Sequence, residues 1–244
     1  MNTNTASRTN HTLGITGITF ERLLRFLPLK QQQKALKTKQ FRKGEYIYHP
    51  YKNGNKIYLV KSGRVKVSKR SEDGREFIQN VAWTGDLFGE LSLIMPFNMG
   101  EYAQALEDTA ICQIPIEAMQ ELMKDNWLMQ LQLMELFAKR LQQTEQLVHS
   151  QIQGDDAYIR IRQWLQSIAE QKGEEVNSSI VAIPRFSPAE IGAIVGTSVQ
   201  TVRNVLKQLK QERFLKIERN QIFIENQSKN IHRTPNFKAL SAIG

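Results

Sequence analysis

Polar and basic side chains gather near the C-terminal end of the chain, in a pattern typical of a helix that reads DNA. Val199, Gln200, Arg203 and Asn204 recur at a spacing that places them on one face of a helix. Gln and Asn can bond adenine with two hydrogen bonds, Arg can bond guanine in the same way, and Val can touch a thymine methyl group. The pattern predicts that these four side chains contact base edges in the major groove.

Hydroxyl and basic side chains flank the four predicted base readers. We expect the following residues to contact backbone phosphates: Thr197, Ser198, Thr201, Lys207 and Arg213. An ordinary solvated helix face carries a similar excess of charge, so the neighbouring elements must decide between the two interpretations.

The neighbouring elements favour DNA binding. SPAEIGAIVG predicts a short helix with Ser187 as N-cap, Pro188 at the first position and Glu190 completing a capping box, ended by Gly196. A second helix, capped by Thr197 or Ser198, follows after the short turn. Its apolar positions recur at helical spacing and are expected to face a core: Val202, Val205, Leu206 and Leu209.

After this second helix, FLKIERNQIFI predicts a hairpin of two strands around an Arg219-Asn220-Gln221 turn. Two helices joined by a Gly-containing turn form a helix-turn-helix, and a following hairpin makes the arrangement winged. The sequence therefore predicts a C-terminal winged helix-turn-helix over residues 154–226, followed by a loose tail over 227–244.

Composition limits the class of protein. A chain of 244 residues with a net charge of +9 is long enough for two domains, and the positive charge is divided almost evenly between them. One cysteine, Cys112, excludes a disulfide framework and any cluster that needs several thiolates. The polar start, residues 1–17, has no apolar core of a signal peptide, and no run is long enough to span a bilayer. We expect a mobile N-terminus and a cytoplasmic protein that does not enter a membrane.

Short segments of alternating polarity occupy the first half of the chain. They are EYIYH, KIYLV, RVKVS, EFIQNVAW, YAQAL and AICQIP, separated by glycines and by a Glu72-Asp73-Gly74 hairpin-turn signal. This spacing predicts a small antiparallel jelly-roll, here called the β-roll, within a domain that covers residues 18–125 and opens with a helix from Ile18. The fold class is therefore α+β.

Helical periodicity returns after the β-roll. A short helix is predicted over 116–124 and a long one over 126–151, with a hinge at Gly154, so that residues 126–153 connect the two domains. An apolar residue repeats every seventh position of the long helix, at Met134, Leu141 and Val148, with Phe137 and Thr144 between them. The repeat predicts a coiled-coil-like seam with a second subunit. The alternative is a helix packed only on its own β-roll. Beyond the hinge we expect a helix from Tyr158, a loop at QKGEEVNSS and an edge strand at IVAIP.

This order of parts resembles the CRP/FNR superfamily of bacterial transcription regulators. Three stretches carry the resemblance: the roll glycines with IYLVKSGRVKV and EDGREFIQNVAWTGDLFGE, the FGELSLI segment, and EIGAIVGTSVQTVRNVLKQL. The resemblance implies a β-roll like that of cyclic-nucleotide-binding domains, a dimerisation helix, a pseudopalindromic DNA target and contact with RNA polymerase.

The effector site departs from the pattern that the resemblance implies. FGELSLI resembles the family's phosphate-binding cassette, in which Glu90 matches the carboxylate that holds a ribose hydroxyl. Where the cyclic-AMP-binding members place an Arg-Ser pair for the phosphate, this chain has Asn98-Met99-Gly100-Glu101-Tyr102, and no Lys or Arg lies between Arg75 and Lys124. A desolvated phosphate would lack its charged donor, unless Arg64 reaches in from another strand. We therefore expect no cyclic AMP at the candidate effector residues Gly89, Glu90, Leu91, Ser92, Gly100 and Glu101.

Other cofactors and enzymatic functions find little support. The β-roll offers four candidate haem ligands, His49, Met95, Met99 and Cys112. His49 is better interpreted as a solvent-facing or turn histidine and Cys112 as a small core residue. The helical methionines are better interpreted as packing residues: Met119, Met123, Met129 and Met134. The four histidines are too scattered along the chain for an oxygenase-type metal site, and no catalytic triad is evident. We expect a non-enzymatic, homodimeric, DNA-binding regulator with no identified cofactor. The alternatives are a cyclic-nucleotide-responsive regulator with an atypical cassette and a regulatory subunit that does not bind DNA.

Overall fold

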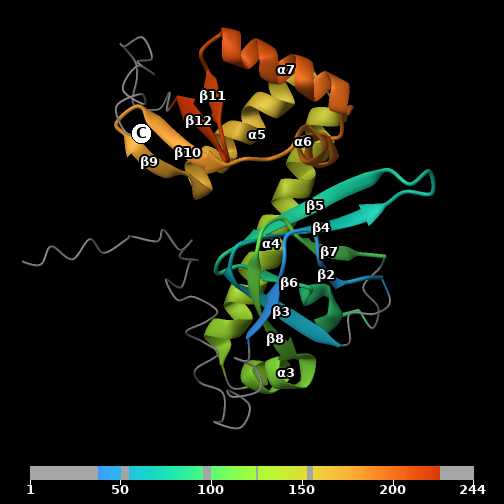
Figure 1. Cartoon of the computed structure of the whole chain (residues 1–244). Coiled ribbons are helices and arrows are strands. Elements are labelled where there is room, and N and C mark those ends of the chain that lie inside the picture. Colours follow the sequence, from blue (N-terminus) through green and yellow to red (C-terminus); the bar gives the residue numbers. More distant parts are fainter. Residues whose placement is uncertain (1–37, 51–54, 96–99, 125, 153–155, 226–244) are drawn as a thin grey trace, which may run out of the picture. The chain divides into compact units, whose positions relative to one another are not determined.

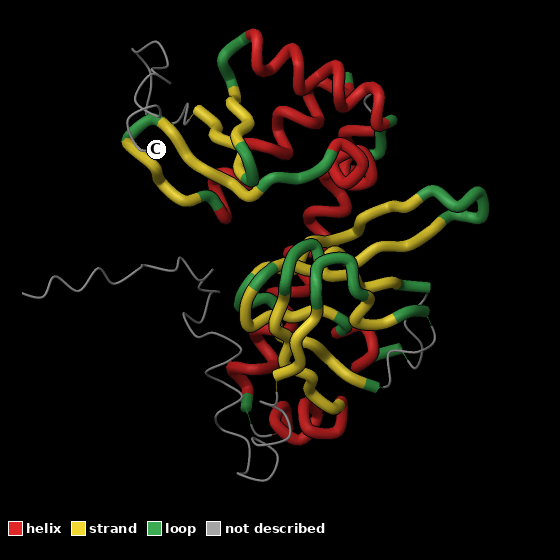
Figure 2. The backbone as a smooth tube through the Cα atoms, in the orientation of Figure 1, coloured by secondary structure: helices red, strands yellow, loops and turns green. Residues whose placement is uncertain are grey.

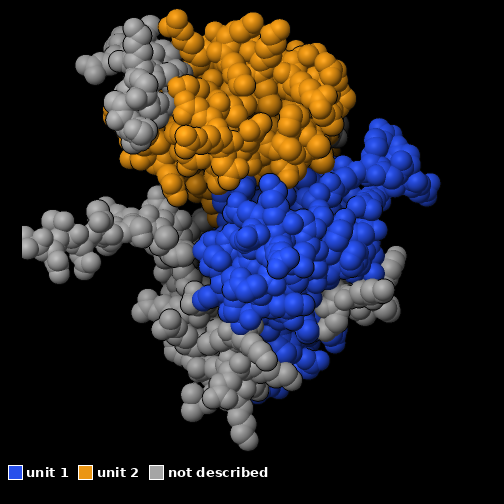
Figure 3. Space-filling model, in the orientation of Figure 1, with its two compact units in different colours: residues 1–146 blue, residues 147–244 orange. Residues whose placement is uncertain are grey.

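The computed structural model describes residues 38–50, 55–95, 100–124, 126–152 and 156–225. The predicted mobile N-terminus, the helix expected from Ile18, the Gly154 hinge and the C-terminal tail lie outside the described residues. The chain divides into two compact units, residues 1–146 and 147–244, and the division falls inside the long helix (Figure 3). Each unit is described below by itself.

Strands dominate the first unit (Figure 2). They are β1 (Thr38–Phe41), β2 (Tyr46–Tyr48), β3 (Lys56–Ser62), β4 (Arg64–Arg70), β5 (Glu76–Trp83), β6 (Leu87–Phe88), β7 (Tyr102–Ala105) and β8 (Thr109–Pro115). They pair antiparallel in two sheets of the described residues, with orders β1-β8-β3-β6 and β2-β7-β4-β5. The prediction of antiparallel sheets combined with helices is confirmed, although β1 and β6 were not predicted.

Period-two alternation decides how β3 is buried. Ile57 and Leu59 face a cluster shared with the helices that follow β8, while Tyr58 and Val60 face the second sheet. The sheet that contains β3 is therefore covered on both faces. Cys112 is fully buried in the first of these clusters, as its apolar strand predicts.

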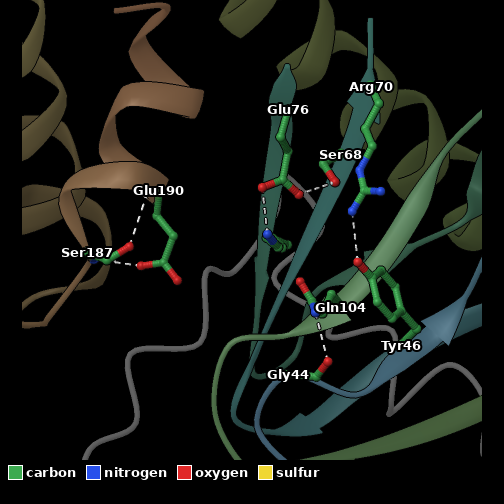
Figure 4. A network of polar contacts seen from close by, with 9 residues as sticks. Gly44, Tyr46, Ser68, Arg70, Glu76, Gln104, Ser187 and Glu190 are labelled. Carbon is green, nitrogen blue, oxygen red and sulfur yellow. Dashed lines mark hydrogen bonds and ion pairs between the residues drawn. The ribbon is translucent and has the colours of Figure 1, made fainter. Parts of the chain in front are cut away.

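The β4–β5 hairpin extends from the β-roll (Figure 1) and turns where the sequence predicts. The Gly74 N–H donates to the Ser71 carbonyl at 2.9 Å, which closes the turn. On the face of this sheet away from its core, Figure 4 shows Ser68 donating to Glu76 at 2.8 Å and Arg70 donating to the Tyr46 hydroxyl at 3.0 Å. These bonds tie β2, β4 and β5 together.

Two helices follow the β-roll at nearly the predicted bounds: α3 (Ile116–Lys124) and α4 (Trp127–Ile152). Met119 of α3 and Met129 and Leu133 of α4 are buried against β3, β6 and β8. A one-turn 3-10 helix, η1 (Glu90–Leu93), lies between β6 and β7. Gly89 precedes η1 with φ 75°, and a Cβ on it would lie 3.0 Å from the Tyr58 ring, so only glycine fits this turn without strain.

The second unit contains α5 (Ala157–Lys172), β9 (Glu174–Asn177), β10 (Ile180–Pro184), α6 (Pro188–Val195), α7 (Val199–Gln211), β11 (Leu215–Glu218) and β12 (Gln221–Glu225). The capping box of α6 is confirmed: the Ser187 N–H donates to Glu190 Oε2 at 2.6 Å, and the Glu190 N–H donates to Ser187 Oγ at 3.2 Å (Figure 4). Gly196 ends α6 in the left-handed region with φ 70°.

Three local predictions in the second unit are wrong. The polar stretch expected to be a loop contains β9, because its backbone pairs with β10. IVAIP is not an edge strand, since β10 lies between β12 and β9 in the sheet. The β11–β12 turn consists of Arg219 and Asn220 alone, because Gln221 already pairs with Glu218.

Candidate nucleic-acid interface and effector site

Helix α7 is amphipathic, with one buried apolar face and one exposed polar face. Val202, Val205, Leu206 and Leu209 are all buried, as predicted. Val199, Gln200, Arg203 and Asn204 are all exposed, so the structure brings the four predicted base readers together on the open face of the helix. In that arrangement the side chains can reach an external partner without any rearrangement of the core.

Hydrogen bonds order the first turns of α7. Ser198 is the N-cap, and its Oγ accepts from the Thr201 N–H at 3.0 Å and lies 2.8 Å from Thr201 Oγ1. Gln200 Nε2 donates to Asn204 Oδ1 at 3.3 Å, so the two amides form one continuous polar pair. The second amide hydrogen of Gln200, its oxygen and the NH2 group of Asn204 remain able to bond a base edge.

Positive charge follows α7 toward its C-terminal end. Lys207 and Arg213 are exposed, and Arg213 has a left-handed backbone with φ 60° directly after the helix. Glu212, which opposes this charge, accepts hydrogen bonds from the Tyr158 hydroxyl and from Gln208 Nε2, the latter at 2.9 Å. These hydrogen bonds lower the pKa of Glu212, so it stays ionised and holds the C-terminal end of α7 to α5.

Sequence reasoning missed the role of Arg185. The Arg185 Nη1 donates to the Arg219 carbonyl at 3.0 Å, and the backbone N–H of Arg185 donates to the Asn220 carbonyl at 2.9 Å. Arg185 therefore fixes the tip of the β11–β12 hairpin to the segment that enters α6. A basic residue two positions before the Ser187 cap was the only signal for it in the sequence.

Exposed apolar residues recur along α4. Met134, Leu141 and Val148 are 66%, 61% and 47% exposed, whereas Phe137 is half-buried and Thr144 is exposed. Thr144 Oγ1 donates to the Arg140 carbonyl at 2.9 Å, a bond within the helix that leaves its methyl group free to pack. Three of the five positions, Met134, Leu141 and Val148, thus carry apolar side chains that the described part of the chain leaves exposed.

The candidate effector residues lie around η1 and the start of β7. Glu90 is fully buried and Glu101 is 4% exposed. Leu91 and Ser92 lie with Glu90 in η1, Gly89 precedes η1, and Gly100 lies in the turn before β7. Asn98 and Met99 lie outside the described residues. The structure therefore brings the two predicted carboxylates into the interior of the β-roll.

Arginine does reach this site, but from a helix that sequence reasoning did not consider. Arg140 of α4 forms an ion pair with Glu90 Oε1, and its Nη2 donates to the Leu87 carbonyl at 3.1 Å. Arg64, the candidate from the sheet, instead pairs with Glu107 at 2.8 Å and lies 5.4 Å from the centre of the Trp83 ring. Sequence reasoning missed this contact because Arg140 lies on a helix, fifty residues from Glu90 in the chain.

Burial controls the ionisation of these groups. It raises the pKa of Glu90 above the ordinary value of 4.5, an effect that the Arg140 guanidinium opposes. Burial and the nearby charge of Glu90 raise the pKa of Glu101. The Tyr48 hydroxyl, which donates to Glu101 Oε2 at 3.4 Å, has a raised pKa because of burial and the charges of Glu101 and Glu90. A group of buried acids is a poor receptor for a phosphate anion.

The candidate cofactor ligands of the β-roll have ordinary structural surroundings. His49 is exposed and packs against the Tyr46 ring at 4.4 Å, as its strand-end position predicts. Met95 is exposed, and Met99 lies outside the described residues. Within the described ranges, none of the helices is both long and apolar enough to cross a bilayer.

Comparison with known proteins gives consistent matches. Residues 38–126 match the cyclic nucleotide-binding domain family. The chain is 24% identical over 204 residues to the CRP-like cAMP-activated global transcriptional regulator of Mycobacterium tuberculosis, covering 82% of this chain and 89% of that protein. It is 27% identical over 185 residues to the transcriptional activator protein Anr of Pseudomonas protegens, covering 75% of this chain and 74% of that protein.

Solved structures extend the likeness to the fold. FixK2 of Bradyrhizobium japonicum matches with a TM-score of 0.68 at 23% identity, covering 82% of this chain and 98% of that one. The antiparallel β-roll, the long helix and the helices beyond it thus occur in the same order in this chain and in regulators that it resembles along most of their length. Residues 38–126 thus match the cyclic nucleotide-binding domain family, and along most of its length the chain is similar to transcription regulators of the CRP/FNR type, as the sequence resemblance predicts.

Proposed function

We propose that the protein is a homodimeric, sequence-specific DNA-binding regulator of transcription. In this proposal α6, α7 and the β11–β12 hairpin form a winged helix-turn-helix, and α7 enters the major groove. The observation that carries the proposal is the open face of α7, where Val199, Gln200, Arg203 and Asn204 stand exposed above a fully buried apolar side. The protein would act in the cytoplasm, bound to DNA and in contact with RNA polymerase.

The side chains divide into base readers and phosphate contacts. Gln200 and Asn204 would bond adenine, Arg203 would bond guanine, and Val199 would touch a thymine methyl group. Thr197, Ser198, Thr201, Lys207 and Arg213 would hold phosphates, because their hydroxyls and charges flank the readers at both ends of α7. Two recognition helices, related by a two-fold axis, would read half-sites about one helical turn apart on a pseudopalindrome.

Arg203→Ala tests the assignment of the readers. We expect the variant to bind its preferred duplex about 5–150-fold more weakly, because a bidentate contact to guanine contributes roughly 1–3 kcal/mol. The preferred duplex is selected by the native protein from a randomised pool, and affinities are measured by fluorescence anisotropy. Replacement of the guanine in that duplex should weaken the native protein but not the variant.

Lys207→Ala is the matched control on the same helix. A phosphate contact carries no sequence information, so this variant should weaken binding to all duplexes alike and reduce the slope of log K against log salt by about 1. If Arg203→Ala keeps the native sequence preference, Arg203 is not a reader. If the native protein selects no duplex at all, the chain is a regulatory subunit that does not bind DNA.

Cyclic AMP should not bind the β-roll. Glu90 is already paired with Arg140, Glu101 is buried beside it, and a phosphate brought among these acids would meet repulsion. We expect millimolar cyclic AMP to leave the melting temperature of the full chain unchanged, because a ligand stabilises only the state that it binds. A rise of several degrees would instead identify a cyclic-nucleotide-responsive regulator with an atypical cassette.

A further inference from the structure

A group of buried polar side chains connects the β-roll to the long helix. We call it the roll acid cluster and define it by Glu90 of η1, Glu101 before β7, Tyr48 of β2 and Arg140 of α4. Arg140 bonds both the Glu90 carboxylate and the Leu87 carbonyl, so a single guanidinium joins α4 to the turn before η1. The ion pair is enclosed, since the side chains of Arg140 and Glu90 are 23% and 1% exposed.

The roll acid cluster contains two carboxyl groups but only one arginine. Glu90 faces Arg140 and Glu101, and Glu101 faces Glu90, Arg140, Tyr48 and the half-buried Lys69 of β4. Tyr58 of β3 also borders Tyr48, and burial raises the pKa of Tyr58 to about 12, so both tyrosines are neutral. Two buried carboxylates therefore lie in the field of one guanidinium and one half-buried lysine, and only Glu90 is in direct contact with the guanidinium.

One carboxylate oxygen of the cluster is left without a donor. Glu90 Oε2 is buried and has no hydrogen-bond partner among the described residues. The Tyr48 bond to Glu101 is long at 3.4 Å. Two like charges in a buried, low-dielectric interior cannot both ionise freely, and one proton taken up by either carboxyl removes one charge and supplies one donor.

We propose that the roll acid cluster is a proton-controlled latch, in which uptake of one proton by the Glu90–Glu101 pair tightens the attachment of α4 to the β-roll through Arg140. With the proton bound, the cluster holds one carboxylate and one guanidinium, which neutralise each other. When the proton is lost, Glu101 competes for the field of Arg140 and repels Glu90 within the same enclosed space. The inference depends only on the β-roll and its contact with α4, and is independent of DNA binding.

The direction of the pH dependence follows from the raised pKa values of both glutamates. A carboxyl whose pKa is higher in the folded state than in the unfolded state contributes stability that is present at and below its ordinary value of 4.5. That contribution is lost as the pH rises through the folded-state value. The latch is therefore closed in mild acid and loosened at higher pH.

Glu101→Gln tests the latch, because it keeps the shape of the side chain and removes the second charge. At about pH 8 we expect the full-length variant to melt about 3–6 °C above the native protein in scanning calorimetry, and to lose most of the native decline in melting temperature between about pH 5 and pH 8. Glu107→Gln is the matched control, since Glu107 is also a β-roll carboxylate paired with an arginine but has a side chain that is 37% exposed. It should keep the native pH dependence.

A carboxyl-carbon NMR titration of glutamate-labelled protein reads the protonation directly. In the native protein the Glu90 and Glu101 signals should titrate above the ordinary range, and in Glu101→Gln the Glu90 signal should move back toward it. The proposal is overturned if no glutamate titrates above the ordinary range, or if Glu101→Gln keeps the native decline of melting temperature with pH. If Glu101→Gln fails to fold, Glu101→Ala and the titration of the native protein decide the same question.

Discussion

Leu141→Asp should convert the protein to monomers and weaken binding to its preferred duplex by at least about 100-fold. Leu141 is 61% exposed at the centre of the apolar positions of α4, and no described residue of its own chain covers it. In the proposed dimer it would meet the same helix of a second subunit, where a buried, unpaired carboxylate is strongly unfavourable. Since a dimer binds with two linked recognition helices, loss of the dimer removes an avidity of about 10²–10⁴.

Sedimentation measures the oligomeric state, and anisotropy on the selected duplex measures the affinity. Gln143→Asp is the control: it adds the same charge two residues away, at an exposed position off the apolar seam. It should remain dimeric and bind like the native protein. If Leu141→Asp also remains a dimer with native affinity, the interface lies elsewhere and α4 serves only its own β-roll.

Arg140→Gln should destabilise the β-roll by about 3–5 kcal/mol at neutral pH, because it leaves the buried Glu90 carboxylate without its cation. For a chain of this length such a loss lowers the melting temperature by roughly 10 °C. The deficit should shrink as the pH falls, since Glu90 can then take up a proton in place of the lost ion pair. Scanning calorimetry of the full chain across the acid-to-neutral range measures both effects.

Removing both partners of the Glu90–Arg140 ion pair tests whether the stability lost in Arg140→Gln comes from the unpaired Glu90 charge. In the Glu90→Gln and Arg140→Gln double variant no charge is left unpaired at this position, so most of the lost stability should return. Lys139→Gln removes the neighbouring cation of α4, whose side chain is 50% exposed and pairs with Glu135 at 2.7 Å, and should cost less than about 1 kcal/mol. A single Arg140→Gln variant that melts within about 2 °C of the native protein would show that the ion pair contributes little.

Local chemistry explains why much of the architecture could be predicted from the sequence. Ser187, Pro188 and Glu190 form a capping box that depends only on residues within one turn, and the structure has it as predicted. The buried face of α7 also follows from spacing, because Val202, Val205 and Leu209 recur at the period of a helix. The β-roll strands were visible for the same reason, since their side chains alternate.

Partners distant in the chain explain the errors. QKGEEVNSS looks like a loop by composition, but the backbone of β9 pairs with β10, and that pairing also removes IVAIP from the edge of the sheet. Backbone pairing of a polar strand leaves no periodic trace in the side chains. Strand β6 is only two residues long and exists because Leu87 and Phe88 pair with β3.

The sequence by itself determined most of the elements, the family resemblance and the polar face of α7, because each depends on neighbours a few residues apart, whereas β1, β6 and β9 depend on distant pairing partners. Only the tertiary structure decided which cation meets Glu90. Arg140 of α4 pairs with Glu90, whereas Arg64 pairs with Glu107, and no pattern in the sequence predicts which arginine pairs with which glutamate. The reason is physical: a buried carboxylate selects its partner by distance in three dimensions, and folding alone brings α4 and η1 within reach of each other.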